Sequence, residues 1–378
     1  MSDHQHNSMA ALNRLPPDLI EAILHFLPVK SLGRFKSVSK RWYSLISSQE
    51  FIKTHIRNLI KNYPNPNPTH LILDHLDGYS TSTSTYSVDI KQLNAQPTPA
   101  TLIAKRLIFQ EPLFEILGSC NGLLLANDKY HNLYLVNPLT RKSLIVPDFD
   151  PSMDNSWNMY PTDETTNKFG YDSSTDDYKV ISIPYNGVPD SDPDTKFARM
   201  YSLRNNSWHM LPIFSYERDI YGPGVLLNNN LHWFVDSRHS TTTTIAAFNL
   251  ASEEFHEIEF PDSVNRAITS KLCALGGKLV VIVRRGEFDY ESWVMKEYGV
   301  LNSWTKLCVI NNDTDYDYEF FSQVSNRDIL LGNNWKNEID IYNMDERRCT
   351  SVTVEGCPER FTVSGTYVES LESVERFR

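Results

Sequence analysis

Residues 198–212 read ARMYSLRNNSWHMLP, in which two short runs with large apolar residues flank a polar turn at residues 204–206. Apolar and polar residues that alternate on both sides of an Asn-rich turn are typical of a β-hairpin. The arrangement recurs as LYLVNPLTRKSLIVP (133–147), IAAFNLASEEFHEIEFP (245–261), MKEYGVLNSWTKL (295–307) and IDIYNMDERRCTSV (339–352). A repeated hairpin is therefore the unit from which most of the chain is built.

The spacing of these hairpins predicts the architecture. They align on Val136, Tyr201, Phe248, Tyr298 and Tyr342, which are 65, 47, 50 and 44 residues apart, and Tyr86 in the weaker TYSVDI lies 50 residues before the first. A second hairpin pattern lies between them, in stretches such as GVLLNNNLHWFV and LCALGGKLVVIV. Two hairpins per repeat of this length predict β-propeller blades of four strands.

Six anchors over residues 63–378 predict about six blades. FTVSGTYVESL near the C-terminus is expected to supply a strand that closes the ring with the first blade. A β-sandwich is the alternative fold, because the first repeat is poorly marked.

The N-terminal part has a different pattern, LPPDLIEAILHFLPVKSLGRFKSVSKRW at residues 15–42. Proline in the first turn and the nearby acids Asp18 and Glu21 favour a helix start, and Pro28 ends that helix. A second helix is expected from Ser31 and a third from near Ser39, with a helical pattern continuing to about residue 60. The apolar stripe is wide for a unit of about 45 residues. We expect one face to serve another protein; the alternative is a cap on the β domain.

Charge separates the two parts. Residues 1–62 contain nine Lys or Arg and four Asp or Glu, a net charge of +5, whereas residues 63–378 contain 27 and 43, a net charge of −16. An acidic body argues against nucleic acid as the main ligand, since phosphate binding needs a basic surface. No apolar run is long enough to cross a membrane, and the five cysteines contain no CxxC pair. Reduced thiols and a cytoplasmic or nuclear protein are expected.

The head resembles an F-box over LPPDLIEAILHFLPVKSLGRFKSVSKRWYSLISSQEFIKTHI, since the Leu-Pro opening, LPVKSL and FKSVSKRW agree in order and spacing. The resemblance implies a three-helix module that binds the Skp adaptor of Skp–cullin–F-box ubiquitin ligases. The residues it assigns to adaptor binding are Leu15, Pro16, Leu19, Ile20, Ile23, Leu24, Leu27, Pro28, Leu32, Val38 and Trp42.

The remainder resembles the F-box-associated domain of plant F-box proteins, on GSCNGLLL, FGYDSSTDDYKV, YSLRNNSW, LHWF and WVMKEYGVLNSW. Related proteins include pollen self-incompatibility F-box proteins and F-box proteins that limit immune receptors. Many are labelled kelch-repeat, although only Gly276-Gly277 matches the kelch glycine doublet here. The expected organisation is a disordered N-terminus at 1–10, a helical F-box domain at 11–62, and a propeller-like, substrate-binding domain at 63–378, an α+β multidomain fold.

Catalytic and metal sites were also considered. GSCNG around Ser119 and Cys120 lacks the G-x-S-x-G order of a nucleophile elbow and indicates a turn at a strand edge. The run from Asp313 to Glu319 lacks the glycine that a calcium loop needs, and His232 has no ligand spacing around it. We therefore expect no catalytic residue, no metal and no cofactor.

Taken together, the chain is expected to be a non-catalytic substrate receptor. It would bind the Skp adaptor and, through it, cullin and RING subunits, and would present a target protein for ubiquitination and degradation. An acidic propeller favours a basic target, such as a self-incompatibility ribonuclease, or else an immune receptor. The alternatives are an adaptor-bound scaffold that does not ubiquitinate and a stand-alone protein-binding propeller; the target-binding residues are unknown.

Overall fold

The structure is a computed structural model of the 378-residue chain. It describes residues 16–377, except for 62–68, 77–82, 95–100, 150–164, 185–197, 212–217, 238–242, 262–263, 265–269, 286–288, 311–317, 319, 326 and 333–337. The expected disorder of residues 1–10 lies outside the described residues.

Four helices form the N-terminal part, which we call the helical module: α2 (Pro17–His25), α3 (Val29–Phe35), α4 (Lys40–Ser47) and α5 (Gln49–Lys61). Helix α2 begins at a proline, whose missing N–H is no loss at that position. Helix α4 is capped by Ser39, whose Oγ accepts a hydrogen bond from the Trp42 N–H at 3.2 Å. The second helix starts at Val29, two residues earlier than expected, and the pattern that continues to about residue 60 is a fourth helix.

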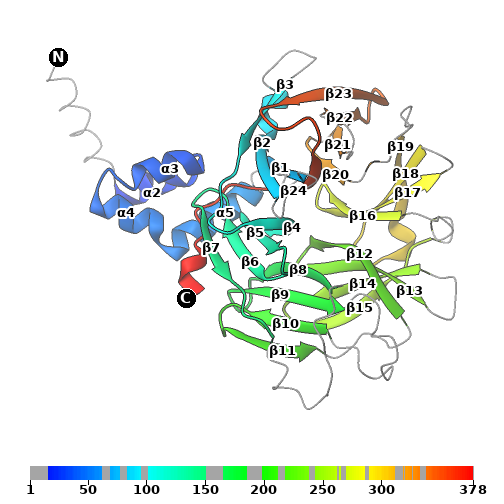
Figure 1. The fold of residues 1–378 in the computed structure, drawn as a ribbon, viewed down its shortest axis with the longest axis horizontal. Helices are drawn as coiled ribbons and strands as arrows, with labels where there is room; N and C mark the ends of the chain where they lie inside the picture. Colours follow the sequence, from blue (N-terminus) through cyan, green and yellow to red (C-terminus); the bar gives the residue numbers. More distant parts are fainter. Residues whose placement is uncertain are drawn as a thin grey trace.

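The strands form six antiparallel blades of four strands each, arranged in a ring (Figure 1). Residues of the first strands of the blades line a cavity in the middle of the ring, the central channel. Blades two to four comprise β4 (Leu113–Cys120), β5 (Leu123–Asp128), β6 (Leu133–Asn137) and β7 (Lys142–Ile145); β8 (Thr165–Asp172), β9 (Asp177–Pro184), β10 (Ala198–Ser202) and β11 (Ser207–Leu211); and β12 (Arg218–Leu227), β13 (Asn230–Ser237), β14 (Thr243–Asn249) and β15 (Glu254–Ile258). Blades five and six comprise β16 (Ser270–Leu275), β17 (Lys278–Arg285), β18 (Asp289–Met295) and β19 (Trp304–Ile310); and β20 (Phe320–Gln323), β21 (Asp328–Gly332), β22 (Glu338–Asn343) and β23 (Arg348–Glu355).

Blade one joins the two ends of the β domain, because its innermost strand comes from the C-terminus. It comprises β24 (Thr362–Tyr367), β1 (His70–Leu76), β2 (Thr83–Asp89) and β3 (Thr101–Arg106). Strand β24 pairs antiparallel with β1, with Tyr367 opposite His70, and contacts the first strands of blades two and six. The predicted closing strand is therefore confirmed, and the closed ring excludes the β-sandwich alternative.

A further link joins the outer edges of blades six and one. Strand β23 runs parallel to β3, with Thr353 opposite Thr101, so the two blades form one sheet of eight strands. Three short 3₁₀ helices complete the described elements: η1 (Ile90–Asn94), η4 (Leu301–Ser303) and η5 (Val374–Phe377).

The repeat anchors occupy equivalent places in the blades, with one exception. Tyr86, Val136, Tyr201, Phe248 and Tyr342 all lie on the third strand of their blades. Tyr298 was expected there too, but it lies beyond the end of β18, in a connection to β19 that contains η4 and is longer than the four-residue turns at 138–141, 203–206, 250–253 and 344–347. The extra residues shift the Tyr–Trp pattern out of register with the strand.

The two ends of the channel differ. Turns between strands one and two and between strands three and four lie at the end where the helical module packs, as Leu139 of the β6–β7 turn and Asp176 of the β8–β9 turn show; we call this end the helix-side face. The strand ends that lead into the connections between strands two and three, and into most of those between blades, lie at the opposite end, the far face. These connections range from three residues between β17 and β18 to 19 between β7 and β8. Long loops carried on a rigid ring are a common place for binding residues.

Candidate functional site

Helix α2 presents an apolar side to solvent. Leu19, Ile23 and Phe26 follow one another at spacings of four and three, so they lie along one side of the helix. Their exposed fractions are 52%, 52% and 74%. Three large apolar side chains exposed in a row on a short helix indicate a surface that another protein covers. We call Leu19, Ile23 and Phe26 the α2 face.

The eleven residues predicted to bind an adaptor separate into surface and core. Leu15 lies outside the described residues; Pro16, Leu19, Ile23, Pro28 and Val38 are exposed; Ile20, Leu27 and Trp42 are half-buried; and Leu24 and Leu32 are buried. Leu24 and Leu32 are fully enclosed in the core of the helical module. They can affect binding only by holding the helices in place, while the exposed members can touch a partner directly.

Two exposed apolar residues were missing from the predicted set. Phe26 is the most exposed large hydrophobic residue among those described, and Tyr43 on α4 is 59% exposed. The position of Phe26 seven residues after Leu19 was the available signal, since this spacing returns to the same side of a helix.

The helical module does not stand apart from the propeller. Leu371, which follows β24, is buried in the same apolar cluster as Leu24, Leu32 and Ile46, and Leu139 from the β6–β7 turn packs against that cluster. The C-terminal segment therefore supplies part of the core of the N-terminal module. Residues 368–377 are called the C-terminal tail below.

Ion pairs and hydrogen bonds surround this apolar contact. Lys30 on α3 pairs with Glu369 at 2.8 Å, and Lys53 on α5 pairs with Asp176 in the β8–β9 turn at 2.5 Å. Arg376 donates a hydrogen bond to Gln49 Oε1 at 2.6 Å and pairs with Glu372 at 3.3 Å. Burial raises the pKa of the Glu372 carboxyl, and the Arg376 guanidinium opposes that rise.

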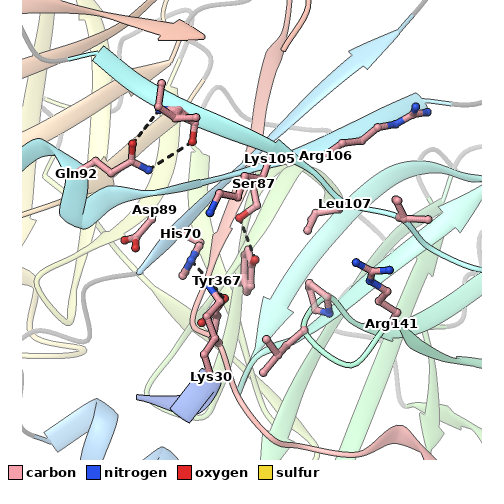
Figure 2. A pocket seen from close by; sticks show the side chains of 15 residues that line it. Lys30, His70, Ser87, Asp89, Gln92, Lys105, Arg106, Leu107, Arg141 and Tyr367 are labelled. Atoms are coloured by element: carbon pink, nitrogen blue, oxygen red, sulfur yellow. Dashed lines mark hydrogen bonds and ion pairs between the residues drawn. The ribbon is translucent and has the colours of Figure 1, made fainter. Parts of the chain in front are cut away.

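A cavity of about 620 Å³ lies at this junction, between α3, blade one and the β6–β7 turn (Figure 2). Glu369 lies 3.5 Å from His70 as well as binding Lys30, and Ser87 and Tyr367 are joined by a hydrogen bond of 3.0 Å. Burial lowers the pKa of His70, against the Glu369 carboxylate, which raises it. These contacts fasten α3 to blade one; they are not arranged as a nucleophile and base.

Ser119, Cys120 and His232 are held by packing and hydrogen bonds, whereas the run from Asp313 to Glu319 lies outside the described residues except for Tyr318. Ser119 donates a hydrogen bond to the Thr366 carbonyl at 2.5 Å, and burial raises the pKa of the Cys120 thiol to about 12. A thiol with so high a pKa is not a nucleophile at neutral pH. His232 is fully buried and bonded to the Val225 carbonyl and the Tyr298 hydroxyl, as a packed histidine should be.

Within the described residues, no group of three or more His, Cys, Asp or Glu side chains is placed to hold a metal ion. Among the described helices, none has the length and apolar character needed to cross a membrane. The five cysteines all lie within the described residues, and none of them is in a disulfide bond.

Comparison with known proteins agrees with the geometry. The model of the F-box associated beta propeller domain matches residues 79–374, and that of the F-box domain matches residues 12–54. F-box protein CPR1 of Arabidopsis thaliana is 27% identical over 379 aligned residues, covering 92% of this chain and 86% of that protein. An F-box/kelch-repeat protein of the same plant is 28% identical, covering 83% of this chain and 84% of that protein. Among solved structures, TolB from Acinetobacter baumannii has a TM-score of 0.48 at 8% identity, over 84% of this chain and 72% of that chain.

Proposed function

This chain belongs to the family of plant F-box proteins that carry an F-box-associated β-propeller, and from that membership we propose that it is a non-catalytic substrate receptor of a Skp–cullin–F-box ubiquitin ligase. The helical module binds the Skp adaptor, which links it to the cullin and RING subunits. The propeller holds a target protein for ubiquitination and degradation. Holding the target beside the ubiquitin-carrying enzyme raises its effective concentration, which is how a receptor without catalytic groups accelerates transfer.

The observation that carries this proposal is the α2 face. A helix side with Leu19, Ile23 and Phe26 exposed suits insertion into an apolar groove of a partner. The net charge of +5 on residues 1–62 adds attraction toward any acidic surface of the partner.

Adaptor binding can be tested by a single substitution in the full chain. Ile23→Glu places a charge in the middle of the α2 face, and we expect binding to a purified Skp adaptor to weaken by roughly 2–4 kcal/mol, which is about thirtyfold or more. Isothermal titration calorimetry on wild type and variant measures this change. Because Ile23 is exposed, circular dichroism should show an unchanged fold.

Ile145→Glu is the matched control, since Ile145 is 53% exposed but lies on β7 of the propeller. It should bind the adaptor as the wild type does. Unchanged binding by Ile23→Glu, or no binding by the wild type, would refute the adaptor-docking role of the helical module.

Removing residues 1–62 is a poorer test, because it would also expose Leu371 and Leu139 on the propeller. Ile23→Glu separates the receptor from the scaffold alternative without this defect. If the chain is a substrate receptor, the wild type should promote turnover of the target in cells and Ile23→Glu should not. If the chain is a scaffold that does not ubiquitinate, target turnover should be the same with the wild type and with the variant.

The charge of the propeller supports a proposal for the kind of target. The net charge of −16 on residues 63–378 supports a basic target, of which a self-incompatibility ribonuclease is one example and a basic surface of an immune receptor another. The proposed site of action is the cytoplasm or the nucleus, where the adaptor and reduced thiols occur together.

A further inference from the structure

A second cavity, of about 670 Å³, lies at the far-face mouth of the central channel. Its walls come from the first strands of blades one to four, together with β1, β5 and the ends of neighbouring connections. None of its lining residues belongs to the helical module or to the C-terminal tail. An occupant of this cavity would therefore not compete with a protein bound to the helical module.

Three residues that line the cavity each have a buried side-chain oxygen that accepts no hydrogen bond from any residue the structure describes. They are Asp74 Oδ1, Asn127 Oδ1 and Asn167 Oδ1. Buried polar atoms in folded proteins are nearly always paired, and leaving one unpaired is costly. Three in one cavity form a set of acceptors that a donating group entering the cavity can use.

The orientation of the two amides shows that the unpaired atoms are acceptors. Asn127 Nδ2 donates to Glu115 Oε2 at 3.4 Å, and Asn167 Nδ2 donates to Thr165 Oγ1 at 3.0 Å. Each amide nitrogen is thus engaged with an oxygen, which leaves the amide oxygens free. The cavity consequently calls for a group that donates several hydrogen bonds.

Charge in the cavity points to a cationic donor. The Asp74 and Glu115 carboxyl groups both line it, and burial raises the pKa of Asp74 to about 6 against hydrogen bonds from Ser364 and Thr85. Lys168 is the cation already present; its ammonium donates to the Leu117 carbonyl, and burial lowers its pKa to about 8. A guanidinium offers five donors in one plane and an ammonium three, and neither can accept a hydrogen bond.

We propose that this cavity receives an arginine or lysine side chain of the target protein, with Glu115 and Asp74 facing its charge and the amide oxygens of Asn127 and Asn167 accepting its hydrogen bonds. The inference rests on the proposed receptor function and assigns the far face to the target. The adaptor and the target then occupy opposite ends of the ring.

Binding to the full chain can be tested with the blocked tripeptides Gly-Arg-Gly, Gly-Lys-Gly and Gly-citrulline-Gly, by saturation-transfer NMR and calorimetry. Citrulline keeps the shape of arginine and loses its charge. We expect the arginine and lysine peptides to bind and the citrulline peptide to bind at least roughly tenfold more weakly. Glu115→Gln should weaken the arginine peptide by a similar factor, and because Glu115 is exposed this variant should fold.

Asp345→Asn is the control, because Asp345 is an exposed acid paired with Arg327 in a turn on the helix-side face. It should leave peptide binding unchanged. Asp74→Asn is a second variant, interpreted only if its melting temperature matches that of the wild type.

Equal binding of the arginine and citrulline peptides, or unchanged binding by Glu115→Gln, would overturn the proposal. Ethylguanidinium that binds as tightly as the arginine peptide would overturn the assignment to a protein target and indicate a small amine or guanidine instead. The result is independent of the adaptor experiment: Glu115→Gln should bind the Skp adaptor normally, and Ile23→Glu should bind the arginine peptide normally, so each claim can fail alone.

Discussion

Gly122, in the β4–β5 turn, is confined by both its backbone and its surroundings. Its φ is +82°, and a Cβ built there would lie 2.3 Å from Ser370 Oγ and 2.7 Å from the Val368 carbonyl oxygen. The turn is thus pressed against the C-terminal tail, and Ser370 donates a hydrogen bond to the Asn121 carbonyl at 2.7 Å. Only glycine fits both the turn and this close approach.

Gly122→Ala should therefore destabilise the protein more than an ordinary glycine replacement does. Gly277→Ala is the matched control, since Gly277 has a φ of +69° but open space around its Cβ position. We expect the control to lower the free energy of unfolding by about 1–2 kcal/mol, because alanine is strained in a left-handed backbone conformation. Gly122→Ala should lower it by about 1–3 kcal/mol more, because the added Cβ also clashes with the tail. Chemical denaturation measures both, and equal losses would show that the tail does not hold this turn.

His232 is expected to make the stability of the protein depend on pH, and its surroundings determine the direction of that dependence. Burial lowers its pKa from 6.5 to about 4, and the nearby His256 adds to this shift, while hydrogen bonds with the Val225 and Asn230 backbone oppose it. Between these values the unfolded chain binds the proton more readily than the folded one, so stability is fully present above pH 6.5 and is lost as pH falls toward 4.

The measurement is the free energy of unfolding of wild type and His232→Gln from pH 7 to pH 4. The wild type should lose up to about 1.4 kcal/mol per pH unit relative to the variant over this window. Asp74, whose pKa is raised, acts in the opposite direction, but it is common to both proteins and cancels in the difference. A difference that does not change with pH would show that His232 is not held neutral.

At the scale of elements, the C-terminal tail joins the helices to the ring. Leu371 belongs to the core of the helical module although it is encoded more than 300 residues after α5. The tail also carries Glu369 and Arg376, which pair with α3 and α5. The angle between module and propeller is therefore set by packed side chains and not only by the connection at residues 62–68.

Leu371→Ala should loosen the module without opening the ring. Removing a buried leucine typically costs about 2–5 kcal/mol, and here the loss falls on the contact between the tail and the helices. Hydrogen exchange of amides in α2 and α5 should accelerate while the blade amides stay protected. Leu307→Ala, at a residue 40% exposed on β19, serves as the control and should change neither set. Equal acceleration in helices and blades would mean that the two parts unfold as one unit.

The sequence predicted those helices, strands and turns that are marked by a pattern of neighbouring residues. The hairpin anchors placed the third strands of five blades, and the Asn-Gly turn of GSCNG was recognised as a strand edge. Tyr298 was placed wrongly because a longer connection preserved the local pattern while shifting the strand. No sequence pattern predicted that Leu371 packs in the core of the helical module. An apolar residue in this part of the sequence looks the same whether it packs in its own domain or in another.

At the scale of the whole molecule, closure of the ring depends on β24. A chain ending at residue 360 lacks β24 and the tail, which exposes the inner edge of β1 and leaves β20 and β4 without a neighbour between them. We expect such a chain to aggregate, because open strand edges pair with other chains. A chain ending at residue 373 keeps β24 and Leu371 and should remain monomeric by size-exclusion chromatography with light scattering. A monomeric, cooperatively folded chain ending at residue 360 would contradict this account.

The overall organisation was predictable because repeats and motif order are properties of the sequence. The number of blades, the closing strand and the helical head all followed from spacing. The far-face cavity did not, since Asp74, Asn127 and Asn167 lie on different blades and only the closed ring brings them to one place. Sites assembled across blades leave no spacing to recognise in one sequence.

The C-terminal origin of β24 also has a consequence for biosynthesis. Translation at about 5–20 residues per second makes a chain of this length in roughly 20–75 s. For nearly all of that time the nascent chain has no closing strand, although its helices and, progressively, its blades are already made, and the helices lack Leu371. Strand β24 and Leu371 must leave the ribosome before either part can be completed, and until then the edge of β1 that pairs with β24 is open to other chains.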